Sequence, residues 1–343
     1  MVVNSGSANT QETRPDWYHE ISRFAKPNLR KAIWQLLNTF IPYSALWVLM
    51  IYTIQKGYSY WITLGLAVVA ASLLIRIFIF FHDCCHGSFF ASRRANRILG
   101  YIAGLLTFTP FEDWRRWHNA HHSSSGDLDR RGAGDVWILT VEEYLAAPFW
   151  KRIGYHFTRN PFSLFGVGPA AVFLIEQRFP HKGAGKPEAF SVNFTNLAIL
   201  ATIGVASLTI GFRTFLLIQL PVLLISGAIG LWLFYVQHQF DGVYWARHGE
   251  FDPTRAALEG SSYYKLPKVL QWISGNIGLH HIHHARSGIP NYHLQQCYDE
   301  IPALQKDEPL TILRSLKSLM MNLWDEKQQK LVSFWSVKAA PPE

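Results

Sequence analysis

The chain has 343 residues, of which 49% are hydrophobic and 15% aromatic, and its formal net charge is +8. The apolar residues occur in runs and the mean hydropathy is slightly positive, so the composition favours an integral membrane protein over two soluble domains. Lys and Arg lie mostly beside these runs and form no nucleic-acid-binding motif. This excludes nucleic acid as the expected partner and indicates membrane lipids instead.

The chain has an odd number of cysteines, namely Cys84, Cys85 and Cys297, and no C-x(2)-C pair occurs. Neither a disulfide framework nor a thiolate zinc site is therefore expected. This cysteine usage fits a reducing environment, so we expect the polar part of the protein to face the cytosol.

The N-terminal part of the chain predicts a tail, an interfacial segment and a first pair of membrane spans. Residues 1–31 comprise the tail, expected to be disordered over residues 1–13, and a segment rich in aromatic and basic side chains. Residues 32–54 and 60–81 are each apolar over the roughly 20 residues that a helix needs to cross a bilayer. The second span ends directly before a cluster of histidines.

The middle of the chain predicts a second pair of spans. Residues 98–111 and 163–175 are apolar but too short to cross. The first segment is expected to be re-entrant or interfacial and the second interfacial. Residues 193–212 and 214–236 are long enough to cross and are separated by a short turn.

Four spans, an even number, place both chain ends on one side, and the density of Lys and Arg predicts that this side is the cytosol. The expected fold is an all-α integral membrane protein with two transmembrane hairpins and a cytosolic helical cap that carries the histidines. Residues 32–300 are expected to form the membrane domain, and residues 301–343 a cytosolic amphipathic helix (about 309–331) and tail. Arg76, near the end of the second span, is expected to reach the lipid headgroups, with a role beside the metal site as the less favoured alternative.

Ten histidines gather in three clusters and one isolated position near the end of the fourth span. Their spacings of three and four residues put side chains on one face of a helix. The clusters are His82 and His86; His118, His121 and His122; and His280, His281, His283 and His284, with His238 alone after the fourth span. Converging clusters of this kind predict a metal site with more nitrogens than one ion can use, and therefore two metal ions.

Imidazole binds Fe, Zn, Cu and Ni, so the ligand type leaves the metal open. The H-E-x(2)-H pattern of zinc hydrolases and the E-x(2)-H pattern of soluble di-iron bundles are both absent. An all-nitrogen di-iron centre at the mouth of four membrane helices fits best. Such a centre is suited to activating O2 against a carbon–hydrogen bond of a lipid chain.

In order and placement, the three clusters resemble those of the membrane fatty acid desaturase family over roughly residues 30–300. The first cluster, H-D-C-C-H, has three residues between its histidines and is similar to acyl-lipid desaturases of the Δ12/ω-6 and bacterial Δ5 kind. The sequence around the third cluster, which runs on to Ile289-Pro-Asn-Tyr292, resembles bacterial acyl-lipid members. The segment around His238 resembles the family's ligand-bearing segment after the fourth span.

The resemblance implies two iron ions and O2 as co-substrate. The implied iron ligands are His82, His86, His118, His121, His122, His238, His280, His283 and His284. His281 is the extra member, expected either to form a hydrogen bond near the site or to face solvent. Asp83 and Asn276 are candidates for orienting ligand imidazoles. The alternative for Asn276 is a turn or a cap, and the alternative for Asp83 is a cap or a pairing with Arg93 or Arg94. Phe234 stands where stearoyl-type members place an Asn near one metal.

The resemblance further implies an enzyme that introduces a cis double bond into a lipid-linked acyl chain. Neither a cytochrome b5-like H-P-G-G stretch nor a ferredoxin-type cysteine run is present, so electrons are expected from an external ferredoxin or a cytochrome b5-like protein. A bacterial inner or plasma membrane is the expected location. The alternatives are a related hydroxylase or ketolase acting on a hydrocarbon, carotenoid or sphingolipid chain, and a non-enzymatic metal carrier; the near absence of ionisable residues within the spans disfavours the carrier.

The aspartates that follow the second cluster, Asp127, Asp129 and Asp135, are expected to organise a loop through the neighbouring arginines. The histidines outside the clusters, including His181, are expected at the surface.

Overall fold

The computed structural model describes residues 15–132 and 134–337. The predicted tail at residues 1–13 lies outside the described residues. The structure is mostly helical, and in the described part of the chain four helices are long and apolar enough to cross a membrane. They are α2 (Leu29–Gln55), α3 (Tyr60–Cys85), α9 (Lys186–Thr209) and α10 (Phe212–His238). The predicted all-α membrane fold is confirmed.

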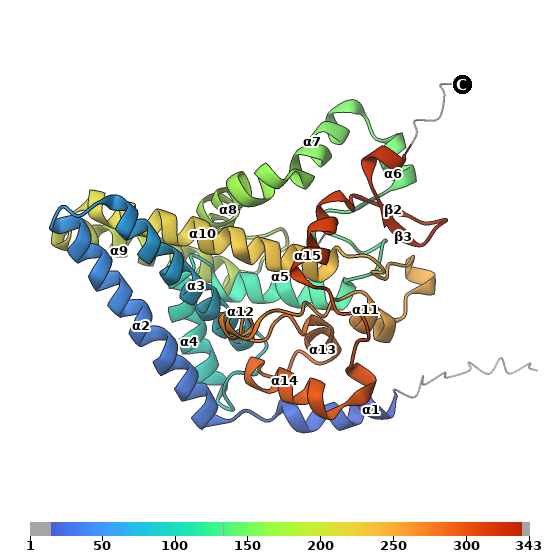
Figure 1. Ribbon diagram of the computed structural model, residues 1–343, viewed down its shortest axis with the longest axis horizontal. Helices are drawn as coiled ribbons and strands as arrows, with labels where there is room; N and C mark the ends of the chain where they lie inside the picture. The colour runs from blue at the N-terminus through green and yellow to red at the C-terminus, as the bar shows by residue number, and fades with distance from the viewer. Residues whose placement is uncertain (1–14, 133, 338–343) are drawn as a thin grey trace, which may run out of the picture.

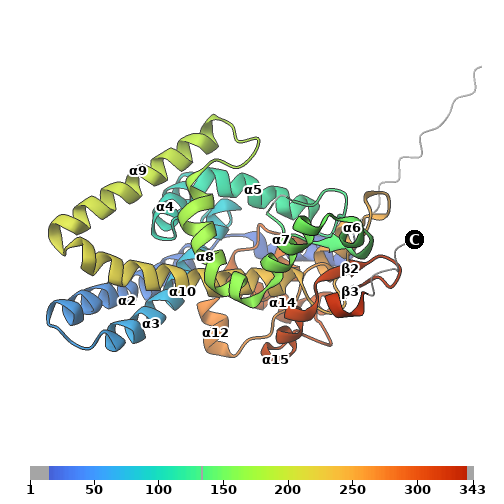
Figure 2. The same cartoon turned by 90° about the horizontal axis from the view of Figure 1, so that it is seen from above.

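Each pair of long helices forms a hairpin closed by a tight turn. Gly57 and Gly211 adopt positive φ values of 72° and 88° in these turns, a backbone conformation that favours glycine because it has no Cβ. Figures 1 and 2 both place the two turns at one end of the molecule and the C-terminal strands at the other. The chain therefore separates an apolar end from a polar cap.

α3 is the central helix of the membrane part. Of its most apolar segment 61% is buried, compared with 22% for α2 and for α9, and it packs against α2, α4 and α10. The outer helices instead carry exposed apolar side chains, among them Ile41 and Val48 on α2 and Leu197 and Leu208 on α9. Lipid covers such faces in a membrane protein, so their exposure is expected.

Arg76 on α3 does not reach the headgroups, and that prediction is wrong. Its side chain is buried, where Nε donates to Thr39 Oγ1 at 3.1 Å and the guanidinium donates to the carbonyl oxygen of Trp272. The guanidinium also lies 4.1 Å from the centroid of the Trp272 ring. These partners inside the protein replace water, which explains how the charge is tolerated there.

Two shorter helices lead from the first hairpin into the cap. α4 (Arg93–Leu106) has 14 residues, too few to cross the bilayer, as predicted for this segment. Phe108, at φ 56°, and Pro110 interrupt the helical path, and α5 (Phe111–Ser124) then begins in a new direction.

The remaining elements build the cap and the strap that connects it to the second hairpin. The strap comprises residues 149–178 and includes helical turns of the wider π type. The cap and strap elements are α1 (Asp16–Glu20), η1 (Ile21–Ala25), α6 (Val141–Ala146), α7 (Phe149–Arg159), η2 (Ser163–Val167), α8 (Gly168–Ala170), η3 (Ala171–Ile175), η4 (Glu176–Arg178), η5 (His248–Glu250), α11 (Pro253–Glu259), α12 (Lys268–Ile273), α13 (His280–Ala285), α14 (Asn291–Glu300), η6 (Pro302–Leu304), α15 (Ile312–Ser315), η7 (Leu316–Met320) and η8 (Phe334–Ser336).

The predicted C-terminal amphipathic helix over residues 309–331 is wrong. After the short α15 and η7 the chain forms two antiparallel strands, β2 (Leu323–Asp325) and β3 (Lys330–Val332), and β2 also pairs in parallel with β1 (Leu139–Thr140). The carboxylate of Asp325 accepts hydrogen bonds from the backbone N–H groups of Lys327 and Gln328, at 2.9 and 3.0 Å. This turn, together with the fully buried Trp324, stabilises a strand pair where the polar pattern had suggested a helix.

Candidate metal centre

Four elements carry the predicted ligand histidines. His82 lies in the last turn of α3, His86 directly follows that helix, and His238 is the last residue of α10, while α5 and α13 present the second and third clusters. The ring nitrogens converge in two groups, and the atoms of each group lie within 4.8 Å of one another. One group comprises His82, His86, His118, His122 and His283, and the other comprises His121, His238, His280 and His284.

In the four-histidine group the Nε2 atoms face one another. Nε2 of His238 lies 3.1 Å from that of His121 and 3.0 Å from that of His280, and His280 lies 3.1 Å from His284 in the same way. Nδ1 of His238 donates to the carbonyl oxygen of Gly260 at 3.1 Å. A neutral ring carries one proton, so Nε2 presents a lone pair to its neighbours, and a cation between the rings would stabilise that arrangement.

The five-histidine group has the same character. Nε2 of His122 lies 3.1 Å from Nε2 of His118 and 3.0 Å from Nε2 of His283. Nε2 of His82 and of His86 are buried and have no hydrogen-bond partner within the described residues. Two nitrogens that bind one ion at about 2.1 Å and at right angles lie about 3.0 Å apart. The spacing and the orphaned nitrogens therefore fit a metal ion in each group.

The electrostatics keep these rings in the form that binds metal. Burial, followed by repulsion from neighbouring imidazoles, lowers the pKa of His118, His122, His280, His283 and His284 well below its ordinary value. These rings are therefore neutral at pH 7, and neutral imidazole is the coordinating species.

Asp83 lies where it can orient a ligand, as the sequence suggested. Its Oδ1 lies 3.2 Å from Nδ1 of His82, and its Oδ2 accepts from the backbone N and the side-chain Nδ2 of Asn291 at 2.7 and 2.8 Å. Gln35 on α2 donates to Asn291 in turn, at 2.9 Å. The alternative pairing of Asp83 with Arg93 or Arg94 is not seen. This chain of hydrogen bonds ties α2, α3 and α14 to one imidazole.

Asp135 contacts a candidate ligand, a partner that the sequence did not predict. The sequence predicted that it organises a loop through arginines, but its Oδ1 lies 2.6 Å from Nδ1 of His121. Both side chains are almost fully buried. The carboxylate therefore fixes the proton of His121 on Nδ1 and turns Nε2 toward the four-histidine group. Of its two neighbours, Asp129 does pair with an arginine, Arg247, at 2.7 Å.

The other two predicted orienting residues contact no ligand imidazole. Asn276 adopts a φ of 61°, and its Nδ2 donates to the carbonyl oxygen of Asn291 at 3.1 Å, so the alternative role in a turn is the one observed. His281 is fully buried and does not face solvent. Its Nε2 donates to the carbonyl oxygen of Leu304 at 2.9 Å, which anchors α13 to the chain beyond α14.

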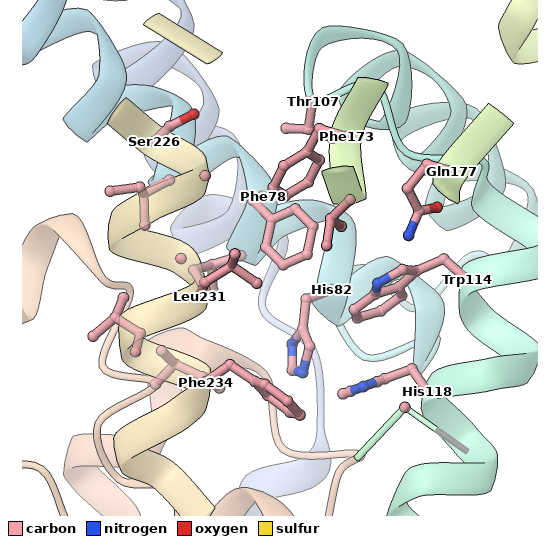
Figure 3. A pocket seen from close by; sticks show the side chains of 18 of the residues that line it. Phe78, His82, Thr107, Trp114, His118, Phe173, Gln177, Ser226, Leu231 and Phe234 are labelled. Atoms are coloured by element: carbon pink, nitrogen blue, oxygen red, sulfur yellow. The ribbon is translucent and has the colours of Figure 1, made fainter. Parts of the chain in front are cut away.

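A cavity of 390 Å³ reaches the histidines from the membrane side and is bordered by His82, His118 and His280. Its walls come mainly from α3, α5 and α10, with η3 and η4 closing another side. Phe78 and Phe234 face it beside the histidines (Figure 3). The lining is predominantly apolar, as is typical of sites for apolar ligands. The fold and the site thus define a membrane protein with a candidate histidine metal centre at the end of an apolar cavity.

The protein can be placed further by comparison with known families. The family model described as fatty acid desaturase matches residues 58–314. The chain belongs to the fatty acid desaturase family, as its histidine clusters predicted.

Individual relatives agree with this placement. The chain is 47% identical over 322 residues to a Bacillus subtilis protein named fatty acid desaturase, covering 94% of this chain and 91% of that protein. It is 25% identical over 258 residues to the sn-1 oleoyl-lipid 12-desaturase of a Synechocystis species, covering 70% and 67% of the two chains. It is also 25% identical over 261 residues to the sn-1 acyl-lipid omega-3 desaturase (ferredoxin) of Synechocystis, covering 71% and 69%.

Proposed function

We propose that this protein is a membrane di-iron desaturase that introduces a cis double bond into a lipid-linked acyl chain. The observation that carries the proposal is the convergence of nine imidazoles, in groups of five and four, at the end of a cavity built between membrane helices. The cavity suits an acyl chain, and the nitrogens suit two metal ions. The two Synechocystis relatives are named for acyl-lipid substrates, which supports a glycerolipid ester as the substrate.

The proposed iron ligands are the same nine residues. His82, His86, His118, His122 and His283 would hold one ion, and His121, His238, His280 and His284 the other. When bound, the irons supply O2 activation. In the overall reaction a CH2–CH2 unit loses two hydrogens and becomes CH=CH, while O2, two electrons and two further protons complete the formation of two water molecules.

The side chains around the irons have separate tasks in this proposal. Phe78, Trp114 and Phe234 border the cavity, where they keep bulk water from the acyl chain. Asp83 and Asp135 hold two of the ligand rings by accepting from Nδ1. The acyl chain is thereby positioned against a preorganised set of nitrogens, and preorganised geometry is the main contribution a protein makes to cofactor chemistry.

The two electrons require an external donor, for which we propose a ferredoxin or, as the second choice, a cytochrome b5-like protein. A separate hollow of 870 Å³ borders His86, His122 and His284. Its rim includes Arg286, which suits an acidic donor. We place this face in the cytosol of a bacterial cell, with the protein in the inner or plasma membrane, because Lys and Arg concentrate on the cap side of the spans.

The test is expression of the full chain in a host that lacks polyunsaturated lipids, followed by iron analysis of the purified protein and mass spectrometry of derivatised acyl chains. We expect about two irons per chain and a new cis double bond, with both reduced in His283→Ala. A hydroxylated product would instead support the related hydroxylase or ketolase. Purified protein that binds iron but modifies no chain with a reduced ferredoxin present would contradict the proposal.

A further inference from the structure

The cavity has one polar end and one apolar end. Along α10 it is bordered from Leu223 to Gln237, which spans about 21 Å at the helical rise. Between Leu223 and Phe234 this wall is apolar except for Ser226, whose hydroxyl donates to the carbonyl oxygen of Leu223 at 3.0 Å. At the opposite side the border is Trp117, Glu176 and neighbouring residues, and the Glu176 side chain is more than half exposed. The cavity thus approaches water at that side.

Gln177 lies just inside this polar end. Its side chain points into the cavity on the side of Trp114 (Figure 3), and the residue is 6% exposed. Its Oε1 is buried without a hydrogen-bond partner among the described residues. Among the described residues that line the cavity, Gln177 and the histidines are the ones with a buried polar atom that has no hydrogen-bond partner. Burying an amide atom without a partner is unfavourable, so a ligand is expected to pair with this end of the amide.

The segment that carries Gln177 is fixed on both sides. Arg178 donates to Asn196 on α9 at 2.8 Å, and Asn196 donates back to the carbonyl oxygen of Arg178 at 2.9 Å. Four residues after Gln177, Nδ1 of His181 lies 2.5 Å from the carboxylate of Asp113 on α5. The prediction that His181 is a surface residue is wrong. The amide is therefore held at a set position relative to α5.

α5 also carries the candidate metal ligand His118. Asp113 precedes His118 by five residues, about 7.5 Å along the helix axis, and the Trp114 ring between them stacks on His118 at 4.2 Å between centroids. The distance from the Gln177 amide to the histidines is thus set by one rigid helix. Among the described residues, the end of the cavity near Leu223 has no comparable unpaired polar side chain.

From these features, and resting on the proposed function, we infer that Gln177 binds the carbonyl group of the acyl substrate. The position of the double bond is consequently counted from the carbonyl end of the chain, and the methyl end extends along α10. A carbonyl oxygen accepts and cannot pair with Oε1. The two ends of the amide are nearly equal in size, so a half-turn of the amide places Nε2 at the orphaned position, where it donates to the carbonyl oxygen. The carbonyl belongs to an ester of a glycerolipid or to a thioester, which offer the same acceptor.

The test uses purified full-length protein in lipid vesicles with a reduced electron donor and saturated chains of increasing length. The chains are supplied as phospholipid esters or as acyl-CoA thioesters, so the two arms distinguish the source of the carbonyl. Gln177→Leu is compared with Gln219→Leu, because Gln219 on α10 is also buried, also has an orphaned amide atom, and does not border the cavity.

For the wild type we expect one double-bond position, constant from the carbonyl for every chain length. In Gln177→Leu we expect double bonds at several positions and an apparent KM raised roughly five- to tenfold, the loss of one hydrogen bond, with the iron content unchanged. Gln219→Leu should match the wild type. A position constant from the methyl end, or a Gln177→Leu enzyme with unchanged positions and KM, would overturn this inference alone. A wild type that forms no double bond would overturn the proposed function as well.

Discussion

Asp135 offers the sharpest test of the four-histidine group, because its carboxylate fixes His121 through one short hydrogen bond of 2.6 Å between almost fully buried partners. A hydrogen bond to a charged group contributes about 1.5 to 3 kcal/mol, which corresponds to roughly a 10- to 100-fold change in affinity. Asp135→Asn keeps the shape and an acceptor oxygen but removes the charge. We expect it to lower metal affinity about 10-fold and Asp135→Leu about 100-fold.

The assay is competition with an iron chelator, followed by counting the iron retained per chain. Both variants should lose the ion of the four-histidine group first and keep the other, because His82 has its own acceptor in Asp83. Asp129→Asn is the matched control, since this aspartate lies in the same loop, is 43% exposed and pairs with Arg247 and with no candidate ligand histidine. If the Asp135 variants release iron as the Asp129 variant does, the argument that this carboxylate orients a ligand is refuted.

Three further predictions concern other parts of the molecule. A Cβ at Gly230 would meet no atom within 4 Å although the residue borders the cavity, so Gly230→Leu should raise the melting temperature slightly, through better helix propensity, yet lower turnover of long chains; equal turnover of short and long chains would contradict it. The Asp113 carboxylate raises the pKa of His181 to about 9, above the ordinary value of about 6.5, so its stabilisation is complete below about pH 6.5 and is lost as the pH rises through 9. Thermal unfolding between pH 7 and 10 should therefore show a decline that His181→Gln lacks, and an identical decline in the variant would refute this. Asp83→Asn should weaken iron in the five-histidine group first, the reverse of the order in Asp135→Asn, as measured by the same chelator titration.

The sequence was sufficient to predict the membrane fold, because apolar runs of about 20 residues are rare outside membrane-spanning helices. It was less informative about where the helices end. The second span was predicted to stop at residue 81, whereas α3 continues to Cys85. Hydropathy falls at His82, but the backbone hydrogen bonds of the helix continue, so the helix extends to Cys85 and carries the first candidate ligand in its last turn. The same holds for His238, which lies two residues beyond the predicted end of its span.

Arg76 and the C-terminal strands show where local reasoning fails. An arginine near the end of a span normally extends to the headgroups, and only the arrival of Trp272 from a distant part of the chain gives it a buried partner. The strand β2 likewise depends on β1, which lies more than 180 residues earlier. In both cases the deciding contact is made by a segment that no local pattern identifies.

For the candidate site too, the spacing of the histidines determines which imidazoles converge in each cluster, and the folded structure determines how the rings are oriented. Spacings of three and four residues aim the imidazoles of each cluster together, and the resemblance to the family identified the nine histidines that converge. Their division into groups of five and four was not predicted, and their role as ligands stays a prediction. For three of the rings the direction depends on an acceptor at the other nitrogen, and these three acceptors share no pattern, while Nδ1 of His280 and of His283 is buried without a partner among the described residues. For His82 it is the adjacent Asp83, for His121 it is Asp135 from the following loop, and for His238 it is the carbonyl oxygen of Gly260. A carbonyl oxygen has no signature in sequence at all, so the orientation of the centre follows from the packing of the cap onto α3 and α10.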